Sequence, residues 1–106
     1  MVFVETSLFS RLLGDYLEDE EYRALQNHLI AHPEAGQVIK ASGGVRKIRW
    51  KLAGKGKSGG VRVIYYWAKA AGQVFMLTLY GKSEKEDLSS ADLRKIIGLL
   101  AELANG

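Results

Sequence analysis

Basic residues alternate along one short stretch of the chain, at Lys47, Arg49 and Lys51, and Arg62 interrupts the apolar run that follows. Because side chains of a strand point alternately to its two faces, the first three should share one face. A guanidinium group holds two phosphate oxygens in parallel hydrogen bonds, and an ammonium group adds a compact positive charge. Cations gathered in this way indicate chemistry on a phosphodiester.

RNA suits such a site, because its 2′-hydroxyl is an internal nucleophile. The protein has only to orient the linkage, stabilise charge on the phosphorane and move two protons. A lysine whose pKa is lowered by cationic neighbours is a candidate base. The predicted catalytic residues are Arg62, Lys47, Arg49 and Lys82, and the predicted RNA contacts are Arg46, Lys51, Lys55, Lys57, Lys85 and Tyr80. No metal and no cofactor are expected.

The charge distribution supports a polyanionic ligand. Ten of the fifteen Lys and Arg residues lie between Ala35 and Ser83, and that segment contains no Asp or Glu. The rest of the chain holds five basic and all twelve acidic residues, so its charge is −7 against +10 in the segment. Such segregation favours nucleic acid as the partner. The alternative is a solvated basic face without a ligand.

Several classes of site are disfavoured. The chain has no cysteine, which excludes disulfides and thiol chemistry. His28 and His32 are four residues apart, but no motif supplies a third zinc ligand. The run from Gly54 to Gly60 is not a phosphate-binding P-loop, because Gly-Lys-Ser is followed by two glycines and a predicted strand. With no membrane-length apolar run and no visible secretory leader, a cytoplasmic protein is expected.

The hydrophobic pattern predicts a single α+β domain over residues 1–106. A short strand at 2–5 precedes a helix that ends at Gly14, and a second helix runs from Glu18 to Pro33. Three strand-like runs follow at 45–52, 61–68 and 74–80, and a last helix starts at Ser89. We expect a twisted, mostly antiparallel sheet with an N-terminal helical hairpin and a C-terminal helix, all helices covering one face. Arg62 should then lie on the open face.

Three stretches, in this order and spacing, resemble the HigB branch of the RelE toxin superfamily. They run from Gly43 to Trp50, from Gly54 to Tyr66 and from Leu79 to Leu88. The opening Val-Phe-Val-Glu and the acidic run ending at Tyr22 fit the same pattern. The resemblance therefore covers nearly the whole chain.

This resemblance implies the RelE-like toxin fold and a type II toxin that cleaves mRNA on the ribosome and inhibits translation. It also implies a cognate HigA-like antitoxin with a helix-turn-helix, through which alone the toxin would reach operator DNA. It places Arg62 on the scissile phosphate and matches Lys47 and Arg49 to the basic pair of the preceding strand. Related toxins carry a further arginine, histidine or tyrosine near the last strand, but Ser83 stands at the arginine position here. The general acid and base therefore stay unassigned.

Two other functions fit the same residues. A non-catalytic module would use the basic sheet only to bind nucleic acid, and an interaction domain would dock an acidic protein on it. Codon preference, the antitoxin surface and the oligomeric state are not encoded in any recognisable pattern.

Overall fold

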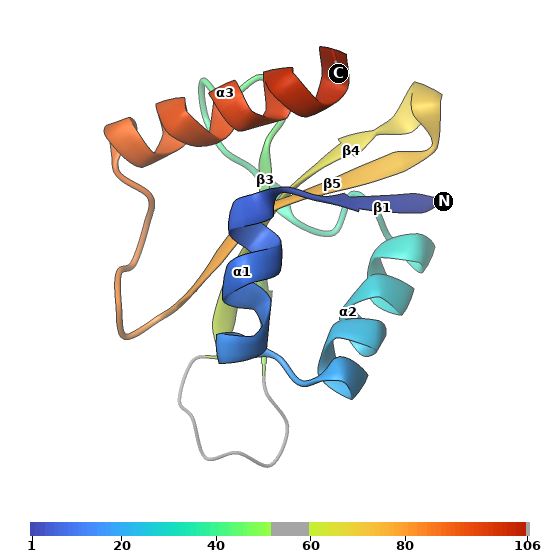
Figure 1. Ribbon diagram of the computed structural model, residues 1–106, viewed down its shortest axis with the longest axis vertical. Helices are drawn as coiled ribbons and strands as arrows, with labels where there is room; N and C mark the ends of the chain where they lie inside the picture. The colour runs from blue at the N-terminus through green and yellow to red at the C-terminus, as the bar shows by residue number, and fades with distance from the viewer. Residues whose placement is uncertain (52–59, 106) are drawn as a thin grey trace.

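A computed structural model of the chain describes residues 1–51 and 60–105. Its elements follow the order β1 (Val2–Glu5), α1 (Ser7–Tyr16), α2 (Asp19–Ala31), β2 (Gln37–Val38), β3 (Arg46–Trp50), β4 (Val61–Ala68), the 3-10 turn η1 (Lys69–Ala71), β5 (Gln73–Gly81) and α3 (Ser90–Asn105). The described strands form one sheet in the order β1-β5-β4-β3-β2. The β1–β5 pair is parallel and the other three pairs are antiparallel. The predicted α+β fold with a mostly antiparallel sheet is confirmed (Figure 1).

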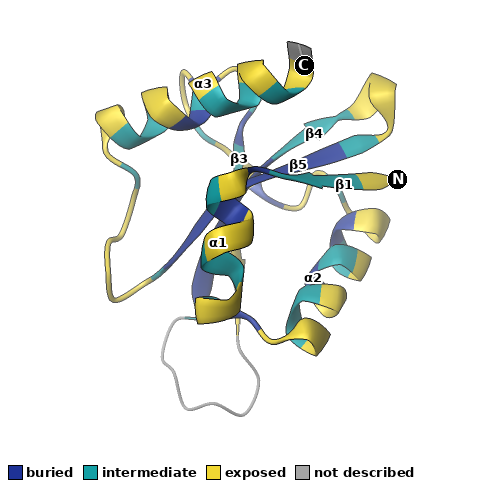
Figure 2. Cartoon of the chain, in the orientation of Figure 1, coloured by how far each residue is buried: buried dark blue, intermediate teal, exposed yellow. Residues whose placement is uncertain are grey.

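Helices cover both faces of this sheet, so the prediction that all of them share one face was wrong. One apolar cluster joins Phe9 of α1 and Leu25 and Leu29 of α2 to the sheet. A second cluster joins Ile96 of α3 to the opposite side, at Phe75 and other residues. Buried positions accordingly concentrate on β4 and β5, the central strands (Figure 2). We call the two sides the α1/α2 face and the α3 face.

The N-terminal helices begin where their capping residues predict. Thr6 accepts a hydrogen bond from the backbone N–H of Phe9 and donates one to the carbonyl of Leu77, which ties α1 to β5. Glu18 and Glu21 form a capping box at the start of α2. Gly14 does not end α1, because the helix continues to Tyr16. None of the helices in the described part of the chain combines the length and apolarity needed to cross a bilayer.

Two features of the sheet were not predicted. The short strand β2 pairs with β3 only at Arg46 and Lys47. Strand β5 carries an irregularity opposite Ile64 and Tyr65, where the pairing passes from Thr78 to Met76 and skips Leu77. Such a bulge shifts the alternation of β5 by one residue. It therefore places Phe75 and Tyr80 on the same α3 face, although they are an odd number of residues apart.

Candidate active site

Strand register brings three of the predicted catalytic residues together. Arg49 is directly opposite Arg62, which is in turn opposite Tyr80 of β5. Lys47 shares their face, two residues before Arg49 on β3. Directly opposite side chains in an antiparallel pair have Cβ atoms about 4.5–5.5 Å apart. We call Lys47, Arg49 and Arg62 the basic cluster, and it lies on the α3 face.

Arg62 lies on the predicted face of the sheet, but it is buried and not exposed as predicted. The residue is on the face opposite α1 and α2, as expected, but its exposed fraction is only 6%. Burial raises the pKa of Tyr80 and the positive charge of Arg62 opposes that rise, while the same charge adds to the lowering of the pKa of Asp87 by Lys47. The guanidinium group therefore belongs to the floor of the site, while Arg49 is exposed above it.

Asp87 is a site residue that the sequence reasoning missed. Its carboxylate forms an ion pair with the ammonium group of Lys47. That hydrogen bond and the charge of Lys47 hold the pKa of Asp87 below its ordinary value, and Arg49 and Arg62 act in the same direction. An anionic group thus already lies against the basic cluster. The available signal was the return of acidic residues directly after the long acid-free segment.

Tyr80 is buried beside the cluster with an unsatisfied hydroxyl group. Its exposed fraction is 3%, and among the described residues the hydroxyl oxygen has no hydrogen-bond partner. Burial is the main reason that its pKa is raised, with the charge of Asp87 next. A cavity of about 280 Å³ reaches from Tyr80 to Lys47 and Asp87. A buried polar atom without a partner commonly marks a functional position.

The segment between β5 and α3, residues 82–89, carries the acidic side of the site and is anchored at both ends. Glu84 accepts hydrogen bonds from the hydroxyl of Tyr16 and from the backbone N–H of Gly81. Lys85 lies 5.3 Å from the ring centre of Tyr80 and 3.3 Å from a carboxylate oxygen of Asp92. We call this segment the connector. Because Lys85 already has these two partners, its predicted contact with RNA would require their exchange.

One of the remaining predicted contacts, Arg46, lies away from the cluster. Arg46 projects to the α1/α2 face, where it donates hydrogen bonds of 3.0 and 2.8 Å to the carbonyls of Glu34 and Gly36. It therefore fixes the chain between α2 and β2. Lys51 and Lys82 are exposed, Lys51 after the end of β3 and Lys82 after the end of β5. Lys55 and Lys57 lie outside the described residues.

A glycine fixes the start of β4 and hence the position of Arg62. Gly60 has a φ of +58°, and a Cβ atom there would lie 2.2 Å from the carbonyl oxygen of Trp50. Only glycine adopts this conformation without strain or collision. Its carbonyl also accepts a hydrogen bond of 3.4 Å from the backbone N–H of Lys82. The first residue of the connector is thereby held next to the strand that carries Arg62.

The two histidines pack as a pair of rings on α2. The ring centres of His28 and His32 are 5.4 Å apart, and those of His28 and Trp50 are also 5.4 Å apart. Within residues 1–51 and 60–105, no three His, Asp or Glu side chains are grouped as metal ligands. The basic cluster is therefore the feature of the described chain whose chemistry points to a reaction.

Comparison with known proteins defines the class of this molecule. It superimposes on the free state of an E. coli RelE toxin mutant, in which two arginines are replaced by alanine, with a TM-score of 0.55. The superposition covers 89% of this chain and 94% of the other at 18% sequence identity, so it shows a shared fold. The molecule has the fold of a small RelE-type toxin.

The family assignment comes from the sequence. Residues 15–105 match the family model of the RelE toxin of the RelE/RelB toxin–antitoxin system. The chain belongs to the RelE toxin family. The predicted superfamily is thus confirmed, and the HigB branch within it stays a prediction.

Proposed function

We propose that this protein is the toxin of a type II toxin–antitoxin system and cleaves mRNA on the ribosome. The observation that carries the proposal is the basic cluster, three cations on adjacent positions of β3 and β4 with a carboxylate drawn into them. RelE toxins are in general endoribonucleases, and a cation cluster on a phosphate is what such a reaction requires.

In the proposed reaction Arg62 and Arg49 bind the non-bridging oxygens of the scissile phosphate. The 2′-hydroxyl loses its proton and attacks phosphorus, and the bond to the 5′-oxygen breaks as that oxygen gains a proton. The products are a 2′,3′-cyclic phosphate and a free 5′-hydroxyl. Lys47 stabilises the added negative charge, and Lys47 and Lys82 are the candidates for proton transfer. No cofactor takes part in this scheme.

Substrate entry would exchange anions at the cluster. Asp87 forms an ion pair with Lys47 in the free protein. The side chain of Asp87 is 72% exposed, so it can move toward solvent. An incoming phosphate then takes its place. Movement of Lys85 away from the ring of Tyr80 would also bring Tyr80 within reach of the RNA, in line with the predicted role of Tyr80 as an RNA contact.

The proposed partners follow from the family. A cognate antitoxin neutralises the toxin, and we propose the HigA-like type with a helix-turn-helix, which would provide the only link to operator DNA. The site of action would be the ribosome in the cytoplasm.

The decisive experiment maps message cleavage in a translation extract with the wild-type protein and Arg62→Ala. Loss of a preorganised charge at the phosphate should lower cleavage about 100- to 1,000-fold. Because Arg62 is buried, thermal unfolding must show that the variant folds, and Arg62→Lys tests the bidentate contact with the charge retained. Lys69→Ala, an exposed cation on η1, is the matched control.

A folded Arg62→Ala protein that cleaves normally would overturn the proposed role. Salt-sensitive RNA binding with intact message would instead show a non-catalytic binding module. Tight binding of one acidic protein with weak RNA binding would identify the basic face as a protein-docking surface.

A further inference from the structure

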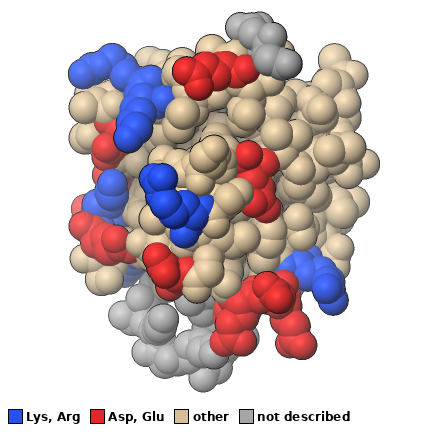
Figure 3. Space-filling view, viewed as in Figure 1, with Lys and Arg blue, Asp and Glu red and all other residues tan. Residues whose placement is uncertain are grey.

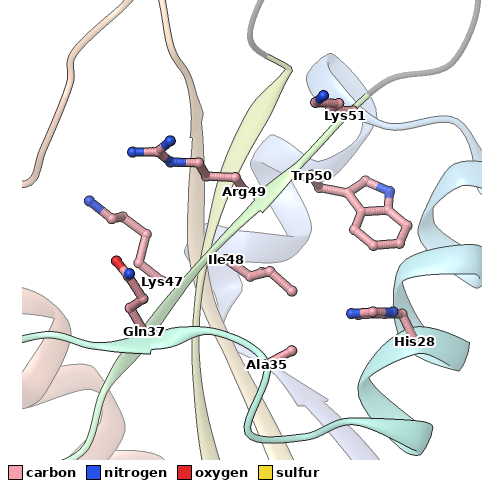
Figure 4. A pocket seen from close by; sticks show the side chains of 8 residues that line it. All are labelled: His28, Ala35, Gln37, Lys47, Ile48, Arg49, Trp50 and Lys51. Carbon is pink, nitrogen blue, oxygen red and sulfur yellow. The ribbon is translucent and has the colours of Figure 1, made fainter.

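A second hollow extends across the edge of β3, from the basic cluster to α2. Its volume is about 670 Å³, and His28, Ile48 and Trp50 form its apolar wall. Lys47, Arg49 and Lys51 also line it, and no Asp or Glu is among its lining residues. Figure 4 shows Lys47 and Arg49 pointing to one side of β3, and Ile48 and Trp50 pointing to the other, toward His28 of α2. The hollow therefore joins an aromatic wall to the cations of the site.

The edge of β3 is open where the hollow crosses it. Strand β2 pairs only with Arg46 and Lys47, and in the described part of the chain no other strand pairs with that edge. Along the segment from Ile48 to Trp50, only the strand β3 itself therefore separates the cationic side chains on one side from the aromatic side chains on the other. An extended ligand can pass around this edge and touch both sides at once.

The chemistry of the two sides fits one ligand class. Single-stranded RNA is bound by cations along its backbone and by aromatic rings that stack on its bases. The ring centres of His28 and Trp50 are 5.4 Å apart with an interplanar angle of 50°, so the two rings form an angled wall. A hollow of this size accommodates a small organic ligand such as a nucleotide. Its acid-free lining suits the phosphate that such a nucleotide carries.

We propose that this hollow is a nucleobase subsite for the nucleotide next to the linkage held by the basic cluster. The base stacks against His28 and Trp50 while its phosphate is bound by Arg49 and Lys51 at the strand edge. The subsite rests on the proposed RNA-cleaving function and adds to it the recognition of a flanking base. It also gives a role to α2, which has no residue in the basic cluster.

The test uses a single-stranded RNA hexamer with 2′-O-methyl groups, which lacks the internal nucleophile and so cannot be cleaved by the proposed reaction. Affinity is measured at low salt by fluorescence polarisation. In a Trp67→Phe background, Trp50 becomes the sole tryptophan and reports stacking through quenching of its emission. His28→Ala should weaken binding about ten-fold, as expected for loss of a stacking ring. His32→Ala, one turn along α2 and exposed, should stay within about two-fold of wild type.

Abasic substitution at each hexamer position then locates the stacked base. At one position the abasic RNA should bind wild type and His28→Ala equally and should no longer quench Trp50. Equal effects of His28→Ala and His32→Ala, or absence of quenching with intact RNA, would overturn the subsite. Because the RNA is not cleavable, these results are independent of catalysis. Loss of the proposed function would appear separately, as intact message in the translation extract with wild-type protein.

Discussion

The two faces of the sheet use the same strands in opposite ways. On the α1/α2 face, the side chains of β3, β4 and β5 are mostly apolar, with Arg46 at the start of β3 as an exception, and two helices cover them. On the α3 face, one end is apolar under α3, and the other end carries the basic cluster with the connector beside it. In the same strands, the side chains that point to the α1/α2 face therefore form a core, and those that point to the α3 face form the charged site.

Surface charge follows the same division. The view in Figure 3 shows Lys and Arg interspersed with Asp and Glu over the helices, the pattern of an ordinary solvated surface. At the basic cluster, three cations occupy neighbouring strand positions. Mutual repulsion makes that arrangement unfavourable unless an anion is present, and Asp87 supplies one in the free protein. The core face should thus govern stability and the charged face activity, and five substitutions test that division.

The largest effect is expected for a core residue of α2. Leu25→Ala removes a fully buried side chain and should lower the free energy of unfolding by about 2–5 kcal/mol. Chemical denaturation measures this change. Message cleavage per folded molecule should remain at the wild-type level. A specific loss of cleavage in folded Leu25→Ala would show that the two faces are coupled.

For Arg49, the exposed member of the basic cluster, we expect a loss of cleavage with little change in stability. Arg49→Ala removes a charge-assisted contact to phosphate, which corresponds to about 1.5–3 kcal/mol or roughly a 10- to 150-fold loss of cleavage. Its stability should change by no more than about 0.5 kcal/mol, because the side chain is exposed. Cleavage assays and denaturation on the same preparation separate the two. Arg49→Ala with normal cleavage would remove Arg49 from the site.

Two buried tyrosines compare the faces directly. The Tyr65 hydroxyl, on the α1/α2 face, accepts a hydrogen bond from Gly36 N–H and donates one to the carbonyl of Pro33, at 2.9 and 2.8 Å. Tyr65→Phe should therefore cost about 1–3 kcal/mol, because both partners are left unsatisfied. Tyr80→Phe removes a hydroxyl without a described partner and should leave stability unchanged or raise it by about 1 kcal/mol.

Cleavage assays complete the tyrosine comparison. Tyr80→Phe should lower cleavage if its hydroxyl reaches the RNA, whereas Tyr65→Phe should not change cleavage per folded molecule. Destabilisation by Tyr80→Phe would show that its hydroxyl is satisfied in solution and would contradict the stated difference between the faces.

The smallest effect is expected at Asp87. The folded-state pKa of its carboxyl is lowered, so its stabilising contribution is present above the ordinary value near 3.8 and is lost as pH falls through the folded value. Asp87→Asn removes this acid-range dependence and should lower stability at neutral pH only slightly, because the ion pair is largely exposed to solvent. It also removes the anion that competes with phosphate, so RNA affinity should rise a few-fold. Isothermal titration at pH 7 checks the affinity, and a fall would mean that Asp87 assists RNA binding.

Much of the fold was predictable because its local signals agree with its tertiary contacts. Alternation in β3 and β4 correctly separated Lys47 and Arg49 from Ile48 and Trp50, and Glu18 marked where α2 starts. The two-residue β2 was missed because so short a strand has no periodicity. The end of α1 was placed too early, since a single glycine costs a helix only about 1 kcal/mol and tertiary context can override it.

The site was predictable in its side chains but not in its surroundings. The alternation placed Arg62 on the correct face, but its burial depends on tertiary packing, which the local pattern does not encode. The contacts of Asp87 could not be predicted, because it pairs with Lys47, 40 residues away, and its charge acts on Tyr80, 7 residues away. The unsatisfied hydroxyl of Tyr80 could not be predicted either, because it depends on the absence of a partner among the described residues.

By itself the sequence determined the strand and helix types of the longer elements, the faces on which the residues of β3 and β4 lie and the concentration of cations in one segment. These properties depend on neighbours within a few residues, where backbone geometry alone sets the direction of a side chain. Only the tertiary structure decided that helices cover both faces, that Asp87 meets Lys47 and that, among the described residues, no strand pairs with the edge of β3 beside Trp50. Those outcomes depend on how separate elements share the burial of apolar surface, which no local pattern encodes.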